Sequence, residues 1–228
     1  MLVMRHEAYC DGVRKHTKPY WSEKRVFEGE GKKEFYTAMM SSMAFNSLNI
    51  KFTKTELMQN DPLDIEKYSF IKNGDDFLQS LYPVFNAEKI VFIPECYYNY
   101  RMNPASLTHR IDPNIHNSIL AVRSVIWNDY LSGTTILGEN TRQVFAMDSA
   151  RSIFNVIKNV AQSDNISDDK KIEIFSEVNN HPFFTDFIEP NLNKNNLEKK
   201  WLVIYELMAR HSYRLLLSTV RILNRIKK

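Results

Sequence analysis

Two adjacent carboxylates, Asp75 and Asp76, follow Gly74 and precede a stretch of apolar residues at helical spacing. A carboxylate can accept a proton from an alcohol while the alcohol attacks an electrophile, so either aspartate can serve as a general base. Acids in the first turn of a helix also stabilise that helix through its exposed N–H groups and its dipole, by about 0.3–1 kcal/mol. The residue types alone leave the catalytic and the structural interpretation open.

The elements around these acids are expected to bring them near the end of a strand. A helix is predicted over residues 75–87, and Pro83 is expected to kink or shorten it. A strand is predicted over residues 89–93, with Pro94 ending it, and a second extended run over residues 96–101 carries several tyrosines and ends in an arginine. Such a place can hold a sugar hydroxyl and a leaving phosphate together.

The rest of the chain predicts a mixed first part and a helical second part. Residues 2–4 are predicted as a strand, and residues 31–44 and 54–59 as helices. After residue 111 helical periodicity dominates, over residues 113–132, 140–162, 168–179 and 195–226, with an ordered linker over 180–194. We therefore divide the chain into domains 1–111 and 112–228. The fold class is assigned as α+β to mostly α, with few strands in the first domain and a helical bundle in the second.

The composition is that of an ordinary globular protein, with 43% hydrophobic and 25% charged residues. The formal net charge of +3 is too small to indicate nucleic-acid binding by itself. The two cysteines form neither a disulfide framework nor a metal motif, so a reduced, cytoplasmic setting is expected. No stretch is long and apolar enough to span a bilayer, the N-terminus lacks the layout of a signal peptide, and no glycine-rich phosphate loop occurs.

Several of these features occur in an order that resembles a known family. Gly-Asp-Asp-Phe-Leu at 74–78, the strand and proline within 86–95, and Tyr-Asn-Tyr-Arg at 98–101 with the polar loop to residue 108 are similar to the second half of glycosyltransferase family 2. These are inverting enzymes of the GT-A fold that use nucleotide-sugar donors, and many bacterial members build cell-envelope polysaccharide. Residues 51–57 resemble a further family stretch, and the resemblance covers roughly residues 1–110.

The resemblance implies roles for individual residues. Asp76 takes the place of the catalytic base that deprotonates the acceptor hydroxyl, and Asp75 stands where the family has a glutamate. The family's Tyr-x-Tyr-Arg end falls on Tyr98, Tyr100 and Arg101, which become candidate substrate contacts. The planar guanidinium of Arg101 suits a phosphate, with pairing to an acid as the alternative.

Three further residues complete the candidate set. Lys51 opens the matched stretch at 51–57 and is a candidate substrate contact. Ser106 lies in the polar loop after the arginine and can either touch substrate or cap the loop. His109 is a weak candidate metal ligand, because some GT-A enzymes supply a late histidine to the donor-bound cation, but no ligand cluster surrounds it in the sequence. No metal site is therefore assigned.

The sequence also departs from the family pattern. GT-A enzymes hold Mg²⁺ or Mn²⁺ through an Asp-x-Asp element, and this chain contains none. It therefore looks like a family member without its nucleotide-binding half, expected to be inactive alone. Truncation, supply of that half by another chain, and conversion to a binding protein stay open, and we favour truncation. The partners of the intact enzyme are a nucleotide-sugar donor and a glycan or lipid-linked acceptor.

The C-terminus carries a second candidate function. Residues 210–228 contain six Lys or Arg and no acid, and on one helix Arg210, Arg214, Arg221 and Arg225 share a face. A basic amphipathic helix can lie on an anionic membrane or pack on the bundle with a solvated basic stripe. The alternative function is a non-catalytic module that docks to a membrane or a partner glycosyltransferase, peripheral at the inner face. Nucleic acid is not expected, because aromatics do not interleave the basic stripe.

Overall fold

The computed structural model describes residues 1–10, 13–15, 19–41, 45–62, 64, 66–71, 74–101, 114–132 and 139–225. For residues 5–10, 13–15, 100–101, 139 and 224–225 only the backbone is described. Within these ranges the protein is mostly helical with a small mixed sheet, so the predicted class of α+β to mostly α is confirmed. The proposed domain boundary near residue 111 falls outside the described residues.

The first part of the chain contains the sheet and three helices. The strands are β1 (Leu2–Cys10), β2 (Val13–Lys15), β3 (Arg25–Glu28), β4 (Lys51–Phe52) and β5 (Lys89–Arg101). The helices are α1 (Lys32–Ser41), α2 (Thr55–Gln59) and α3 (Asp75–Asn86), with single 3-10 turns η1 (Gly29–Gly31) and η3 (Leu48–Ile50). The predicted helices at 31–44, 54–59 and 75–87 are thus confirmed to within a few residues.

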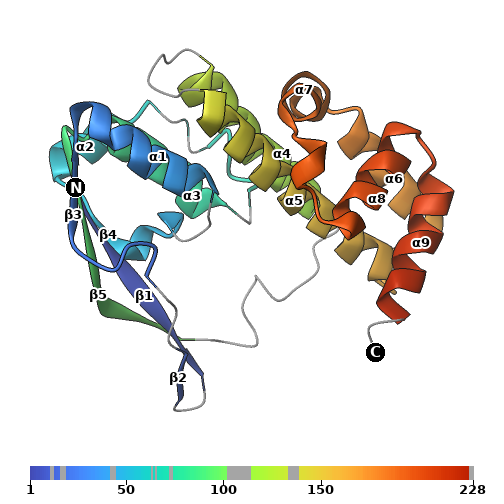
Figure 1. Cartoon of the computed structure of the whole chain (residues 1–228), viewed down its shortest axis with the longest axis horizontal. Helices are drawn as coiled ribbons and strands as arrows, with labels where there is room; N and C mark the ends of the chain where they lie inside the picture. The colour runs from blue at the N-terminus through green and yellow to red at the C-terminus, as the bar shows by residue number, and fades with distance from the viewer. Residues whose placement is uncertain are drawn as a thin grey trace.

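The second part is helical throughout its described residues. Its elements are α4 (Ile115–Val125), the π-helical η5 (Ile126–Leu131), α5 (Glu139–Gln162), α6 (Asp168–Asn179), the π-helical η6 (Phe183–Ile188), α7 (Glu189–Asn191), the 3-10 turn η7 (Lys194–Asn196), α8 (Lys199–Ala209) and α9 (Tyr213–Arg225). In Figure 1 the sheet lies at one end with α1 and α3 beside it, α4 and α5 cross the middle, and α6, α8 and α9 form the other end.

The sheet has the order β2-β1-β5-β3, and β4 pairs with the start of β1. β1 and β5 are parallel, whereas the other pairs are antiparallel. The register places Lys51 opposite Val3, Val3 opposite Phe92, and Phe92 opposite Arg25. These four residues therefore form one row across the sheet.

Pro94 does not end a strand, contrary to the prediction. β5 continues through it to Arg101, and the register of β1 against β5 shifts between Val3 and His6, opposite Phe92 to Tyr98. The β3 ladder also stops at Phe92, so β5 lacks that partner where the proline occurs. Because proline is tolerated in sheets at bulges and on unpaired edges, one irregular strand replaces the two predicted runs.

Of the two effects predicted for Pro83, a kink or a shorter helix, shortening does not occur, because α3 continues past Pro83 to Asn86. Two other helical predictions need correction. The predicted linker over 180–194 is largely helical, because Phe183, Phe184, Phe187 and Ile188 turn inward from η6 and are buried. The predicted helix over 195–226 is broken between α8 and α9, where His211 adopts a φ of 51° that helical residues do not have.

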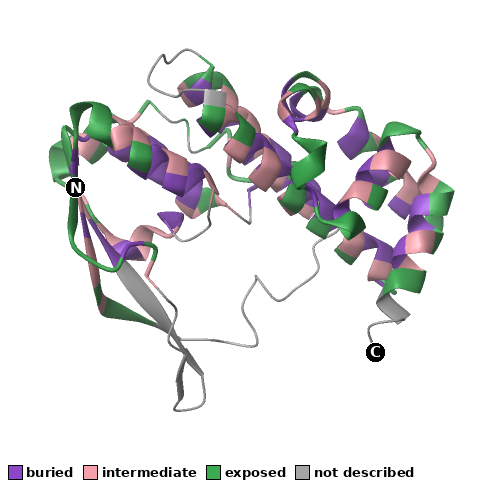
Figure 2. Ribbon diagram, in the orientation of Figure 1, coloured by how far each residue is buried: buried purple, intermediate pink, exposed green. Residues whose placement is uncertain are grey.

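The hydrophobic core runs without a break from the sheet to the last helix. Near the sheet, Trp21 contacts a group of aromatic rings at centroid distances of 5.0 to 6.2 Å, namely Phe27, Phe35, Phe45 and Phe92. Farther along, α1 packs on α5, and the Thr37 and Thr141 hydroxyls lie 2.9 Å apart. Figure 2 shows the buried positions concentrated on the sides of the helices that face one another.

A buried arginine joins α4 to α5. Arg123 is 6% exposed and donates to the Asp148 carboxylate at 2.7 Å, to the Ser149 hydroxyl at 2.8 Å and to the Ser152 hydroxyl at 2.7 Å. Its guanidinium also lies 5.6 Å from the centre of the Phe145 ring. All of these partners come from α5, so this one side chain fixes both the spacing and the rotation of the two helices.

Replacing Arg123 with alanine is expected to lower the free energy of unfolding by about 3–5 kcal/mol, because it leaves the Asp148 carboxylate unpaired beside the core. Urea denaturation measures this change. Arg151→Ala removes an exposed arginine from the same region of α5 and should change stability by less than about 0.5 kcal/mol. Equal stability of the two variants would show that the buried pair does not hold the helices together.

Candidate functional site

Gly74 positions the two predicted acids at the start of α3. Its φ of 94° lies in the left-handed region, which favours glycine. A Cβ atom there would also lie 3.3 Å from Cγ2 of Val122 on α4, tighter than ordinary contact. The turn at Gly74 therefore sets where α3 begins and places Asp75 and Asp76 in its first turn.

The two acids have different surroundings. Asp75 is exposed, whereas Asp76 is half-buried. Oδ2 of Asp76 accepts a hydrogen bond from the Leu48 N–H at 3.2 Å, and the buried hydroxyl of Ser80 donates to the Asp76 carbonyl oxygen at 2.6 Å. Asp76 thus ties the first turn of α3 to η3. The spacing of four residues between Asp76 and Ser80 is a helical signal that the sequence analysis did not use.

Lys51 lies near Asp76, because both bind the segment at residues 47–48: the Lys51 ammonium donates to Ser47, and Asp76 accepts from the Leu48 N–H. The Lys51 ammonium donates to the Phe45 carbonyl oxygen and, at 2.7 Å, to the Ser47 carbonyl oxygen. Burial lowers the pKa of Lys51 to about 7, against the opposing effect of the nearby Asp76 carboxylate. A carboxylate beside an amine that changes protonation near neutral pH can move a proton and can hold a hydroxyl or phosphate oxygen.

Arg101 lies apart from this pair. Its backbone is opposite Tyr9 of β1, six residues beyond Val3, the residue that faces Lys51. At the rise of a β-strand, that separation is about 20 Å along the sheet. The side chain of Arg101 is outside the described residues, so only its backbone is placed.

The other candidate contacts are divided between β5 and the segment after it. Tyr98 is 37% exposed on β5, and its neighbour Tyr97 is 69% exposed. Tyr100 is opposite Ala8, and its side chain is not described. Ser106 and His109 lie outside the described residues, so their roles stay predictions.

The residues around Asp76 do not fit a divalent cation. Among the described residues no group of three His, Cys, Asp or Glu side chains is arranged to hold a metal ion. At Asp76 the neighbouring charged group is the Lys51 amine, which in its protonated form would repel a cation. No step at this site is therefore routed through the Mg²⁺ or Mn²⁺ that the family resemblance implies.

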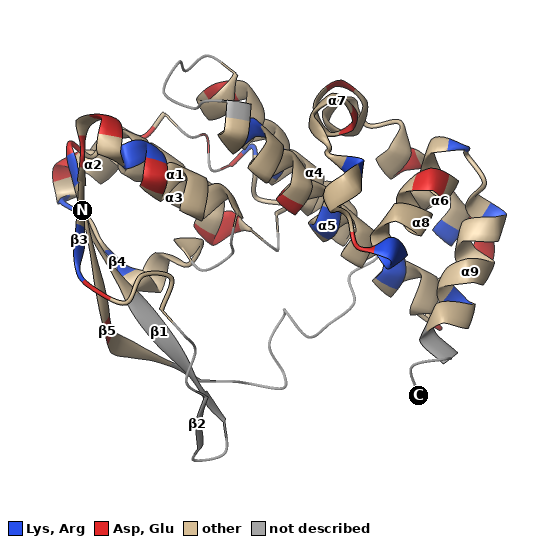
Figure 3. Ribbon diagram, in the orientation of Figure 1, with Lys and Arg blue, Asp and Glu red and all other residues tan. Residues whose placement is uncertain are grey.

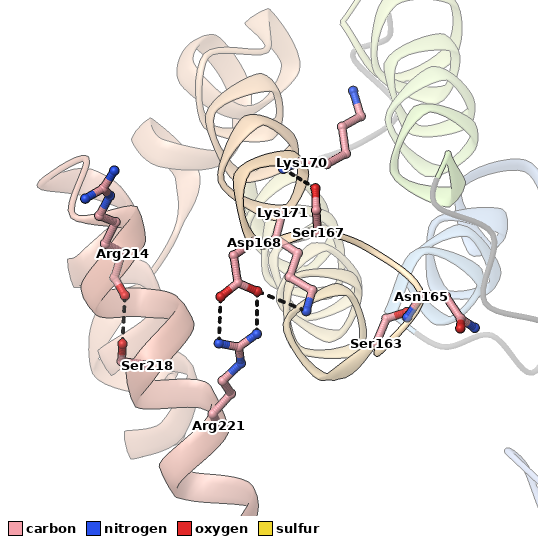
Figure 4. Close-up of polar contacts among 9 residues, drawn as sticks. All are labelled: Ser163, Asn165, Ser167, Asp168, Lys170, Lys171, Arg214, Ser218 and Arg221. Carbon is pink, nitrogen blue, oxygen red and sulfur yellow. Dashed lines mark hydrogen bonds and ion pairs between the residues drawn. The ribbon is translucent and has the colours of Figure 1, made fainter.

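The C-terminal helix is held by an ion pair that the sequence did not reveal. Arg221 donates through both terminal nitrogens to the two oxygens of Asp168, one at 3.0 Å, and Lys171 lies 3.5 Å from the same carboxylate (Figure 4). The hydrogen bonds from Arg221 lower the pKa of Asp168. Ser167 caps α6 beside this pair by accepting from the Lys170 N–H at 3.3 Å.

The predicted four-arginine stripe is therefore divided. Arg210 precedes the break at His211 and lies 3.7 Å from Glu206 of α8, so it is not on α9. Leu216, Leu217 and Val220 are buried on the inner face of α9. Figure 3 shows acidic and basic side chains mixed over the helices at this end of the molecule. Packing on the bundle is the arrangement that the structure has.

Comparisons with known proteins add no assignment. No protein-family model matches the sequence, and no curated protein matches it. Within the described residues, no helix has both the length and the apolar character needed to cross a membrane.

The depressed pKa of Lys51 makes stability depend on pH. Between pH 7 and pH 10 the unfolded chain keeps the Lys51 proton and the folded chain loses it, so stability should rise with pH in this window. Lys51→Met should remove this rise and raise stability at pH 7. Urea denaturation at pH 7 and pH 9.5 measures both effects.

Lys199→Met is the matched control, because Lys199 is exposed at the start of α8. Its pH dependence should equal that of the unaltered protein. If Lys51→Met keeps the full rise between the two pH values, Lys51 is not the group that titrates.

Proposed function

We propose that residues 1–111 form the acceptor side of a glycosyltransferase similar to family 2, and that Asp76 accepts the proton of the acceptor hydroxyl. The observation that carries the proposal is the half-buried Asp76 carboxylate in the first turn of α3, beside the amine of Lys51. The order of sequence motifs around Gly74 and Arg101 supports the family assignment.

The proposed reaction is one displacement with inversion at the sugar. The acceptor oxygen forms a bond to the anomeric carbon while the bond from that carbon to the donor phosphate breaks, and Asp76 takes the hydroxyl proton. The backbone N–H of Leu48 fixes the orientation of the carboxylate, since it donates to Oδ2. Lys51 is held by two backbone carbonyls and in its charged form would attract the phosphate oxygens.

The family's element for donor binding does not occur in this sequence. The 228 residues contain no Asp-x-Asp element, and the described residues contain no metal-binding cluster. The groups that hold the nucleotide diphosphate are therefore proposed to lie outside this sequence. The acceptor is a glycan or lipid-linked sugar bound on the Asp76 side.

Asp76→Asn should reduce sugar transfer by at least about 100-fold, because asparagine keeps the shape and the bond to Leu48 but cannot accept the proton. The measurement is transfer from a panel of UDP- and GDP-sugars with Mn²⁺. Asp75→Asn changes the exposed neighbouring acid and should keep most of the activity.

Calorimetric titration with the same donors separates the two parts of the proposal. Because the donor-binding groups are proposed to lie outside this sequence, the chain alone is expected to bind no donor, and donor binding by it would refute that part of the proposal. In an enzyme to which the donor-binding part has been supplied, an active Asp76→Asn variant would refute the assignment of the base.

A second candidate function is docking to an anionic membrane or to a partner glycosyltransferase. It is favoured by the outer face of α9, where Leu215 and Ile222 are 58% and 56% exposed. Each lies one turn from the exposed Ser218, and Leu215 directly follows the exposed Arg214. Apolar side chains next to a basic residue are typical of helices that lie in a membrane interface. The pairing of Arg221 with Asp168 reduces the charge available for this contact.

Replacing both Leu215 and Ile222 with serine should release the protein from vesicles that contain anionic lipid, measured by co-sedimentation. Deletion of the whole helix is unsuitable, because it would remove the buried Leu216 and Val220. Val203→Ser alters an exposed apolar residue of α8 and is the control. If the unaltered protein does not sediment with such vesicles, membrane docking is excluded.

A further inference from the structure

A groove with its own chemistry is lined by the C-terminal parts of α3 and α4, by the two π-helical segments η5 and η6, and by Pro62, Asp64, Lys67 and Tyr68. It consists of two adjoining cavities of about 510 and 580 Å³. The cavities share Lys67, Tyr68, Val125 and Asp129, so one occupant can extend through both. Each volume falls within the range of roughly 300–1,000 Å³ typical of small-molecule sites. None of the residues proposed for sugar transfer lines this groove.

The two π-helical segments contribute much of one cavity. η5 supplies Trp127, Asn128 and Asp129, and η6 supplies Phe183, Asp186 and Phe187. π-helical turns are rare and occur often at functional sites, because the wider turn changes the direction of side chains. Here two such turns lie on the same cavity, and each places a carboxylate on it.

The groove offers both hydrogen-bond donors and acceptors. Asp64, Asp129 and Asp186 carry acceptor carboxylates. His181 accepts the Phe183 N–H at Nδ1, 3.1 Å away, and burial lowers the pKa of His181, so the neutral ring carries its proton on Nε2 and can donate from there. Burial raises the pKa of Tyr130 to about 12, so its phenol stays uncharged, and Tyr68 and Tyr82 also carry phenol hydroxyls on the groove.

Ser124 of α4 also lines the groove, but its hydroxyl oxygen is buried from it. Among the described residues that oxygen makes no hydrogen bond. A ligand in the groove therefore meets Ser124 through its other atoms, and the hydroxyl is not counted among the groups that bind the ligand.

Several aromatic rings that line the groove already pack against other side chains of the protein. Trp127 is stacked on Phe187 at 4.1 Å between ring centres, and the Arg142 guanidinium lies 5.5 Å from its ring centre. Phe85 is stacked on Tyr36 at 4.6 Å. The Tyr130 ring lies 5.0 Å from that of Phe85, and the Lys67 amine lies 5.3 Å from the centre of the Tyr68 ring. Tyr68, Tyr82 and Tyr130 each bring a phenol to the lining of the groove.

We propose that this groove binds a neutral oligosaccharide. Sugar hydroxyls both donate and accept hydrogen bonds, which matches the mixture of carboxylates, phenols and imidazole on the groove. The carboxylates disfavour an anionic ligand, and Lys67, in the part that both cavities share, disfavours a cationic one. The proposal does not rest on sugar transfer, because neither Asp76 nor Lys51 lines the groove.

The test is a glycan array of neutral and acidic oligosaccharides, followed by calorimetry with the best neutral one. Asp129→Ala should weaken its binding at least tenfold, since Asp129 lines both cavities and is exposed enough for the fold to tolerate the change. Asp169→Ala removes an exposed acid of α6 that does not line the groove and should leave affinity unchanged. Asp76→Asn should also leave it unchanged, which separates this site from catalysis.

Three outcomes would overturn the proposal. The first is an array that retains no neutral oligosaccharide, and the second is an Asp129→Ala variant that binds it as tightly as the unaltered protein does. A tetralysine peptide that binds, where neutral sugars do not, would assign the groove to a cationic partner instead.

Discussion

The buried guanidinium of Arg123 is the constraint on which the rest of the arrangement depends. A charge with so little contact with water must be paired, and its partners Asp148, Ser149 and Ser152 all lie on α5. α4 is therefore held in one position against the longest helix. The residue before Arg123 packs at the Gly74 turn, and Val125 lines the groove, so the same contact positions both candidate sites.

The spacing of apolar residues was enough to predict most helices, but it did not predict the π-helical turns or the bulge at Pro94. The helix at 75–87 was predicted because its apolar residues recur at helical spacing, and α3 matches it. The π-helical η5 and η6 were not predicted, since a π-helical turn depends on packing around it and has no period of its own in the sequence. Pro94 was taken as a strand end because the bulge that tolerates it depends on pairing with β1, which is distant in sequence.

The candidate site was predicted in part. Asp76 and Lys51 were both selected from the sequence, but their proximity follows from the packing of η3 on α3 and could not be predicted from spacing. The distance of Arg101 from them follows from the parallel register of β1 and β5. The groove could not be predicted, because its lining consists of single side chains from separate segments that only the tertiary fold brings together. Tyr98 and Tyr100 keep their proposed roles only if substrate reaches the far end of β5.

The geometry of α3 relates the two sites to each other. Asp76 is in the first turn, and Tyr82 and Phe85 lie six and nine residues later. At 3.6 residues per turn, these positions point about 120° and 180° away from Asp76 around the helix axis. A saccharide in the groove would therefore occupy the opposite side of α3 from the proposed base and could not present its hydroxyl to Asp76. If both proposals hold, the groove binds a glycan at a distance from the hydroxyl that reacts at Asp76. α3 lies between the two sites and is held in place by α4, so it fixes the distance between them.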